Sequence, residues 1–256
     1  MLAELKHHSK SVATAHSGRL ILENRISADS QVNQESHHRF KDRVEAGQLL
    51  ARHIESSRSR HPDLVVALPR GGIIVGAQIA KQLHVPLELL VVRKLGAPSQ
   101  PELALGAIAS GGFIFLNQAL IEQFGISNEK IAEIRRGEEI ELARRELRYR
   151  RNHKPTNLTE KHIILVDDGI ATGATIEVAI RAIKAARPAS LVIATPVAAL
   201  PAAERLHRLA EHIHALQTPN ELGAIAEFYV EFDQVSDEEV VRTLESVEKG
   251  MRSNDR

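Results

Sequence analysis

The sequence predicts an α/β fold with an open parallel sheet and helices on both of its faces. Short apolar runs, such as residues 64–68 and 163–166, alternate along the chain with segments of helical periodicity. Continuous apolar strands are typical of parallel sheets, because both faces of such a sheet are covered. Right-handed crossovers place the loops that follow these strands along one edge of the sheet, where ligands bind. We therefore expect functional residues directly after the strands.

The individual elements follow from local periodicity. The first helix is predicted by apolar residues that recur every three or four positions, namely Phe40, Val44, Gly47, Ala51 and Ile54. A hairpin is predicted over 107–116, because Gly111 and Gly112 stand between strand-like flanks. We further expect strands at 64–68, 87–92, 163–166, 191–195 and 212–216, helices at 73–83, 117–124, 128–151 and 176–186, and a helix from Pro201.

Length and composition fit a soluble globular protein. The 256 residues are 43% hydrophobic, enough for one large domain or two small ones, and no linker divides the central part. The formal net charge is zero, so no overall attraction to nucleic acid or to a membrane is expected. No apolar run approaches the roughly 20 residues that span a bilayer. The absence of cysteine excludes disulfides and thiolate catalysis and favours a cytoplasmic location.

Residues 1–38 differ from the rest of the chain. They carry five histidines among polar residues without sustained periodicity, so we interpret them as a mobile tail; a metal-binding role is the alternative. The folded domain is expected over 39–248, and residues 249–256 are expected to form a C-terminal tail.

The most informative segment is Ile163-Ile164-Leu165-Val166-Asp167-Asp168-Gly169-Ile170-Ala171-Thr172-Gly173-Ala174-Thr175. A strand delivers two adjacent carboxylates to the sheet edge, where they can accept hydrogen bonds from a vicinal diol. The following loop of small residues opens a helix, and its backbone N–H groups can hold a phosphate. Thr172 and Thr175 can add hydroxyl donors. This combination suits a ribose 5-phosphate, whereas the alternative is an ordinary turn with a helix cap.

This run resembles the signature of type I phosphoribosyltransferases, which binds 5-phosphoribosyl-1-pyrophosphate (PRPP). One departure is Gly169, which stands where many members carry an aliphatic residue or serine. The resemblance covers roughly residues 40–248 and is strongest to a bacterial subgroup with an undefined acceptor. The segments that carry it further are Leu68-Pro69-Arg70-Gly71-Gly72, Val92-Arg93-Lys94-Leu95-Gly96-Ala97-Pro98, Pro101-Glu102-Leu103-Ala104-Leu105-Gly106-Ala107 and Gln234-Val235-Ser236-Asp237-Glu238-Glu239.

A second anion site is predicted after the first strand. Gly71 and Gly72 allow the backbone to approach an anion closely, and Arg70 can bind a phosphate with two hydrogen bonds. The resemblance implies that these three residues hold the pyrophosphate. It also implies a non-proline cis peptide bond between Pro69 and Arg70, which would aim backbone N–H groups into the anion site.

Residues 93–101 are expected to form a mobile flap, because glycine and two prolines interrupt a long connection. Such a flap could close over the reacting centre. Arg93 and Lys94 would then add positive charge near the leaving group, although solvated basic residues on a loop are the simpler interpretation.

The resemblance implies a small hood over approximately 217–235 that covers the acceptor. Phe228, Tyr229 and Phe232 lie there and serve either to stack on a base or to pack the hood itself. The arginines at the end of the predicted helix 128–151 are interpreted as a solvated face rather than an RNA-binding surface.

These observations together predict an enzyme that transfers ribose 5-phosphate from PRPP to an undefined nitrogenous acceptor and releases pyrophosphate. Mg²⁺ is expected as the cofactor, held mainly by oxygens of the ligand and by water. We predict no separate metal site in the protein and no nucleic-acid or membrane partner, and the resemblance implies a homodimer. The alternative is a non-catalytic protein that senses PRPP or a nucleotide.

Overall fold

The computed structural model describes residues 39–57, 60–98, 100–151 and 155–254. The chain divides into two units between His38 and Arg39, and the predicted N-terminal tail lies outside the described residues. In chain order the elements are α2 (Arg43–Ser57), β1 (Leu64–Ala67), α3 (Gly71–Leu83), β2 (Leu87–Leu89), β3 (Val92–Ala97), β4 (Gln100–Ala109), η1 (Ser110–Gly112), β5 (Phe113–Leu116), α4 (Gln118–Gln123), α5 (Asn128–Arg150), β6 (His162–Val166), α6 (Ala174–Ala185), β7 (Ser190–Val197), α7 (Leu200–His207), β8 (His212–Gln217), η2 (Ile225–Phe228) and α8 (Asp237–Asn254).

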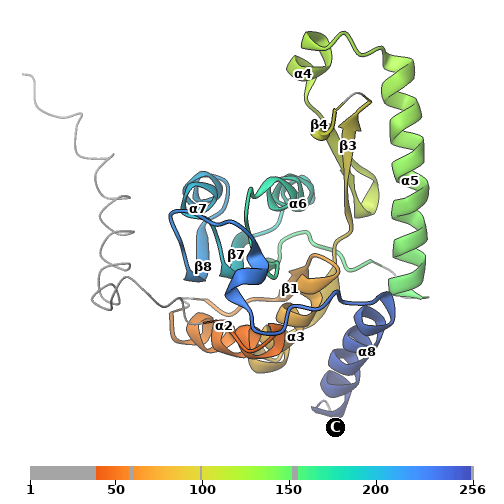
Figure 1. The fold of residues 1–256 in the computed structure, drawn as a ribbon. Coiled ribbons are helices and arrows are strands. Elements are labelled where there is room, and N and C mark those ends of the chain that lie inside the picture. Colours follow the sequence, from red (N-terminus) through yellow and green to blue (C-terminus); the bar gives the residue numbers. More distant parts are fainter. Residues whose placement is uncertain (1–38, 58–59, 99, 152–154, 255–256) are drawn as a thin grey trace, which may run out of the picture. The chain divides into compact units, whose positions relative to one another are not determined.

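The central sheet is parallel and has the strand order β2-β1-β6-β7-β8. Helices α2 and α3 cover one face of this sheet, and α6 and α7 cover the other (Figure 1). The predicted α/β class, with its parallel sheet and helices on both faces, is confirmed.

Alternating side chains of β1 explain why both faces are covered. Val65 and Ala67 pack with the helices α2 and α3, whereas Leu64 and Val66 pack with α6 and α7. Since successive residues of a strand point to opposite faces, an entirely apolar strand needs a hydrophobic layer on each side. All four residues of β1 are buried.

The register between β1 and β6 fixes the functional edge. Ala67 lies opposite Val166, and the N–H of Leu68 donates to the carbonyl of Val166 over 2.9 Å. Both strands end directly after these positions. The loops that begin at Leu68 and Asp167 are therefore neighbours.

The strand predicted over 87–92 is two strands in different sheets, and this prediction is corrected. β2 belongs to the central sheet, whereas β3 forms an antiparallel sheet with β4 and β5. The chain changes sheets at Leu90 and Val91, both buried. Because residues 89–92 are all apolar, nothing in their pattern marks this change.

Two differences concern the ends of the folded part. Val44, which was predicted to lie on the apolar face of the first helix, is exposed, and α2 buries Ala46 and Leu50 instead. α8 runs without a break past residue 248, where we expected the domain to end, and Met251 packs against the core. No helix in the described part of the chain is long and apolar enough to cross a membrane.

Candidate functional site

The loops after β1 and β6 touch each other at two glycines. A Cβ built on Gly71 would lie 1.8 Å from Asp168 Oδ2, and one built on Gly72 would lie 3.0 Å from Asp167 Cα. Any side chain at position 71 would therefore displace the carboxylate. The structure brings the predicted pyrophosphate loop and the predicted ribose acids together.

The loop before α3 leads into an uncapped helix N-terminus. The Pro69–Arg70 peptide bond is cis, as predicted. α3 begins at Gly71, and no side chain caps its N-terminus. The first N–H groups of a helix lack partners within the helix, so an uncapped N-terminus is a place where anions bind.

The two acids form a hydrogen-bonded pair with different surroundings. Asp167 Oδ1 accepts a hydrogen bond from the N–H of Asp168 over 3.0 Å. Asp168 Oδ2 accepts one from Arg43 Nε over 2.7 Å, and the Asp168 carbonyl accepts one from the Tyr229 hydroxyl over 2.7 Å. The side-chain contacts of the pair with these donors thus engage Asp167 Oδ1 and Asp168 Oδ2. One oxygen of each carboxyl group is thus left to accept from a diol.

The two acids differ in their electrostatic surroundings. Burial and the adjacent charge of Asp168 raise the pKa of Asp167 well above the ordinary aspartate value, whereas the charge of Arg43 lowers it. Two carboxyl groups in contact do not both ionise readily. The raised pKa therefore concerns Asp167, whereas Asp168 is the acid that pairs with Arg43.

The small-residue loop 171–175 leads into α6. Gly173 has φ of +73° at the N-terminus of α6, and no side chain caps this helix either. Such a φ strongly favours glycine. Arg205 of α7 donates to the carbonyl of Thr172 and lies 3.8 Å from Glu177 Oε2 through its Nε. A cation thus lies beside the predicted phosphate loop.

Arg70 meets the start of α8. Its Nη1 lies 4.0 Å from Asp237 Oδ1, and its side chain is 34% exposed. Asp237 also accepts a hydrogen bond from the Tyr149 hydroxyl over 2.7 Å and pairs with Arg148 over 3.0 Å. Burial, followed by this contact with Asp237, raises the pKa of Tyr149 to about 12. Asp237 therefore links α5 and α8 to the predicted pyrophosphate loop.

Residues 93–97 and 100–101 of the predicted flap form strands instead of a loop, and this part of the expectation is corrected. Residues 93–97 belong to β3 and pair with β4, because strand pairing satisfies their backbone hydrogen-bonding groups. Arg93 Nε donates to Glu138 Oε2 of α5 over 2.6 Å. Lys94 is exposed and projects from the opposite face of the strand. The side chains of Arg93 and Lys94 therefore do not act as a pair.

The aromatic residues of the expected hood pack with one another. Phe228 and Tyr229 are buried, and the ring of Tyr229 lies 4.7 Å from that of Phe232 and 5.5 Å from that of Phe40. The interpretation as hood packing accounts for these contacts. Phe40 is not part of a helix, because it forms a β-bridge with Tyr229.

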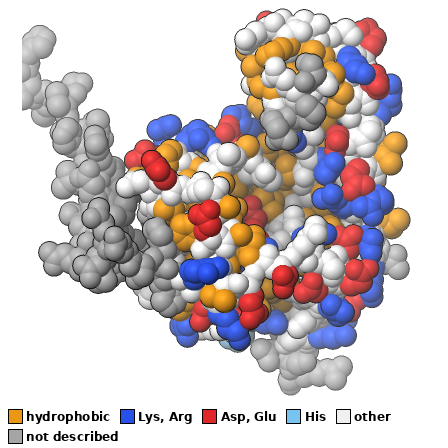
Figure 2. Space-filling model, viewed as in Figure 1, with side chains coloured by type: hydrophobic (Ala, Val, Ile, Leu, Met, Phe, Trp, Pro, Cys, Tyr) orange, Lys and Arg blue, Asp and Glu red, His pale blue; other side chains and the backbone are white. Residues whose placement is uncertain are grey.

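The arginine-rich end of α5 is neutralised within the protein. Arg144 and Arg145 both bind Glu141, and Arg150 binds Glu88 over 2.6 Å. Figure 2 shows acidic and basic side chains interspersed over the face it presents. These contacts account for the arginines without an RNA-binding surface, and Arg150, with a side chain only 10% exposed, is shielded rather than solvated.

Three residues at the site could not be predicted from the sequence: Arg43, Arg205 and Ile225. Arg43 and Arg205 are single cations on amphipathic helices, and nothing in their local pattern distinguishes them from surface arginines. Ile225 packs against Gly169. The one sequence feature that pointed to this contact was Gly169, which departs from the family pattern.

A family model described as phosphoribosyl transferase domain matches residues 35–214. The match contains both loops at the sheet edge and ends before η2 and α8.

Individual relatives agree with this match. A curated protein from Mycobacterium tuberculosis (strain ATCC 25618 / H37Rv), named "Putative phosphoribosyl transferase", is 39% identical over 206 residues. The match covers 80% of this chain and 46% of that protein, so this chain spans about half the length of the curated relative. The crystal structure of TT1426 from Thermus thermophilus is similar with a TM-score of 0.71 and 36% identity, covering 80% of this chain and 97% of that one.

Proposed function

Because the chain belongs to the phosphoribosyl transferase domain family, we propose that it binds PRPP with Mg²⁺ and transfers ribose 5-phosphate to a nitrogenous acceptor. One observation carries the proposal: Gly71 of the first loop lies directly against the Asp168 carboxylate of the second. The proposed anion site and the proposed diol site would then lie side by side at one sheet edge.

Each loop has a proposed role. Asp167 and Asp168 bind the ribose hydroxyls through their two remaining oxygens. Residues 171–175 bind the 5-phosphate at the uncapped N-terminus of α6. Arg70, Gly71 and Gly72 bind the pyrophosphate. Lys94 is still proposed to lie near the leaving group. Arg93 is no longer proposed for that role, because its guanidinium donates to Glu138.

The chemistry needs no covalent intermediate with the protein. An acceptor nitrogen forms a bond to carbon 1 of the ribose while the bond to the pyrophosphate oxygen breaks and its electron pair leaves with pyrophosphate. The acceptor nitrogen loses its proton to solvent water. Carbon 1 develops positive charge on the way, so positioning and neutralisation of the leaving group are the protein's main tasks.

Mg²⁺ fits this site as a companion of the substrate. Among the described residues there is no cluster of three or more His, Cys, Asp or Glu side chains that could hold a metal ion. PRPP oxygens and water would therefore supply most ligands, as is usual for Mg²⁺ with phosphate substrates. Once bound, the ion would neutralise charge on the pyrophosphate.

The proposal is tested in two steps. Titration calorimetry with PRPP and Mg²⁺ should show saturable binding that is lost when Asp167 and Asp168 are both replaced by asparagine. Pyrophosphate release is then measured across a panel of nucleobases and amines, with the same double variant as the control. Absence of PRPP binding would refute the proposal, and binding without release for any acceptor would favour a PRPP-sensing protein.

A further inference from the structure

We infer that Arg43 is a positioning residue of the ribose site, which places a positive charge beside the acid pair and aims the second oxygen of the Asp168 carboxylate at the substrate. The inference rests on the proposed function, because that function assigns the acid pair to ribose. Arg43 belongs to neither loop. It is the first residue of α2 and lies 125 positions before Asp168 in the sequence.

The contact between the two residues is close and shielded from solvent. Arg43 Nε lies 2.7 Å from Asp168 Oδ2, and the two side chains are only 11% and 16% exposed. A guanidinium stays charged at any pH of interest, and a shielded ion pair is screened little by water or salt. Arg43 therefore places a weakly screened positive charge beside the acid pair.

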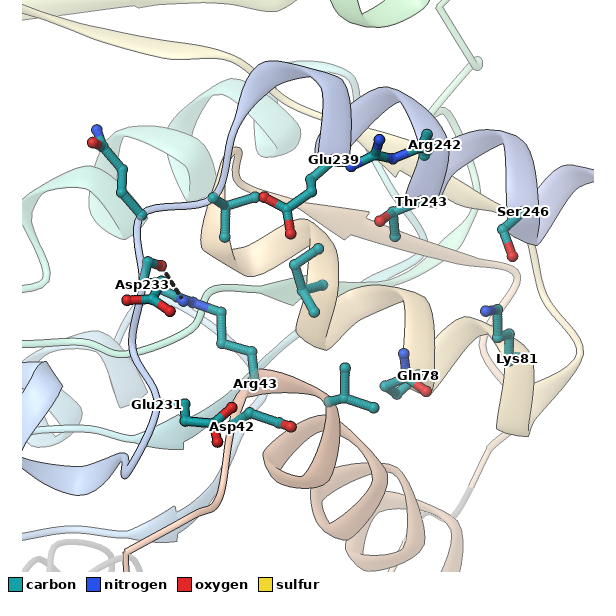
Figure 3. A pocket seen from close by; sticks show the side chains of 14 residues that line it. Asp42, Arg43, Gln78, Lys81, Glu231, Asp233, Glu239, Arg242, Thr243 and Ser246 are labelled. Carbon is teal, nitrogen blue, oxygen red and sulfur yellow. Dashed lines mark hydrogen bonds between the residues drawn. The ribbon is translucent and has the colours of Figure 1, made fainter.

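The guanidinium is itself fixed from other directions. Its Cζ lies 3.7 Å from the centroid of the Phe232 ring, and its Nη1 donates to the carbonyl of Asp233 over 2.8 Å. Figure 3 shows this hydrogen bond at the wall of a cavity of about 500 Å³ that is lined by residues of α2, α3 and α8. Arg43 thus has little freedom to leave Asp168.

Asp168 is held on its backbone side by the same segment. The Tyr229 hydroxyl donates to the Asp168 carbonyl, and Tyr229 is fully buried. α3 faces the pair with Gly71 and Gly72, which carry no charge. Arg43 and Tyr229 are therefore the titratable groups that these elements turn toward Asp167 and Asp168. Burial and the charge of Asp168 raise the pKa of Tyr229, so Tyr229 remains neutral and Arg43 supplies the compensating charge.

The consequence for binding follows from the two carboxyl oxygens. Arg43 engages Oδ2, which leaves Oδ1 as an acceptor for one ribose hydroxyl. Without the cation, the two adjacent acids would retain a proton to higher pH, because the charge of Arg43 lowers the pKa of Asp167 in addition to the hydrogen bond from the Asp168 N–H. Asp168 would also lose the contact that fixes its rotation.

The test compares Arg43→Gln, Arg43→Lys and Arg52→Gln by PRPP affinity between pH 5 and 9. Glutamine keeps much of the volume but removes the charge, so affinity at pH 7 should fall at least about tenfold, and the pH at which affinity declines on acidification should rise by about one unit or more. Lysine keeps the charge and should shift this pH less. Arg52 is an exposed residue of the same helix, and its replacement should change neither value.

A second measurement does not depend on PRPP. Infrared spectra of the free protein should show a protonated carboxyl band that persists to higher pH in Arg43→Gln than in the wild type. If wild-type protein does not bind PRPP, the proposed function fails, yet this band still tests the charge effect of Arg43. An unchanged band and an unchanged pH profile in a folded Arg43→Gln variant would overturn the inference. If Arg43→Gln does not fold, Arg43→Lys carries the test: weaker PRPP binding supports the positioning role, and wild-type affinity would overturn it.

Discussion

Ile225 occupies the space that a side chain at position 169 would need. A Cβ built on Gly169 would lie 2.3 Å from Ile225 Cγ2 and 2.9 Å from Ile225 Cγ1. Gly169 directly follows the acid pair, and Ile225 opens η2 in the expected hood. The glycine that departs from the family pattern is thus accompanied by an aliphatic side chain from a distant part of the chain. A side chain at position 169 and the side chain of Ile225 would therefore compete for the same space.

This shared volume predicts a compensating pair of substitutions. Gly169→Ala should destabilise the protein by about 1–3 kcal/mol, because overpacking forces side chains and backbone to shift. Adding Ile225→Ala should recover most of that loss, since the methyl group then has room. Urea denaturation of both single variants and the double variant measures the coupling. Strictly additive effects would show that the two residues do not compete for space.

Asp167 should make stability depend on pH in a defined direction. Burial and the charge of Asp168 raise its pKa in the folded protein, so the folded state binds this proton more tightly than the unfolded chain. Stability is then lost as the pH rises from the ordinary aspartate pKa, about 3.9, through the raised value. Asparagine cannot ionise, and it can still accept the hydrogen bond from the Asp168 N–H.

We therefore expect Asp167→Asn to be more stable than the wild type at pH 7 and similar to it near pH 3. The free energy of unfolding from urea titrations at several pH values checks this expectation. The same variant should bind PRPP far more weakly, because a ribose acceptor is lost. Asp168→Asn is the informative contrast, since it removes the anion that Arg43 pairs with and should reduce stability at pH 7.

The two loops could be predicted from the sequence because each is a local pattern. Asp167, Asp168 and the small residues after them follow a strand, and the strand's position in a parallel sheet sets the edge at which they lie. The family resemblance also anticipated the cis bond before Arg70. Neither conclusion required knowledge of contacts between distant segments.

The remaining parts of the site depend on distant contacts. Arg43 reaches Asp168 from 125 residues away, and Arg205 reaches Thr172 from 33 residues away. A single arginine on a helix has the same local pattern whether it faces water or a carboxylate. Arg93 was misjudged for a related reason: glycine and proline suggested a loop, whereas pairing with β4 and the contact with Glu138 decide its conformation.

Arg205 should orient the phosphate loop without touching the phosphate. It donates to the Thr172 carbonyl, and in a trans peptide the N–H of the next residue points the opposite way. The Gly173 N–H is thereby turned from Arg205. Arg205→Ala should weaken PRPP binding about five- to tenfold, since one hydrogen bond contributes about 1 kcal/mol. Arg208→Ala, an exposed position three residues later, is the control and should bind normally. Equal affinities of the two variants would exclude this role.

Arg70 should contribute directly to PRPP affinity. Within the described residues its guanidinium has one charged partner, Asp237, at 4.0 Å, so most of its donors remain for a ligand. Hydrogen bonds to charged groups contribute about 1.5–3 kcal/mol, and Arg70→Ala should therefore weaken PRPP binding about 10- to 100-fold. Arg70→Lys should recover part of the loss, because it restores the charge but not the two-pronged geometry.

Arg148→Ala separates this effect from disturbance of Asp237. Arg148 pairs with the same carboxylate, over 3.0 Å, but from α5. If Arg70 acts on the ligand, calorimetry should give Arg148→Ala nearly wild-type affinity for PRPP. If both variants lose affinity equally, the cluster around Asp237 would matter through the position of α8, and the assignment of Arg70 to the pyrophosphate would be wrong.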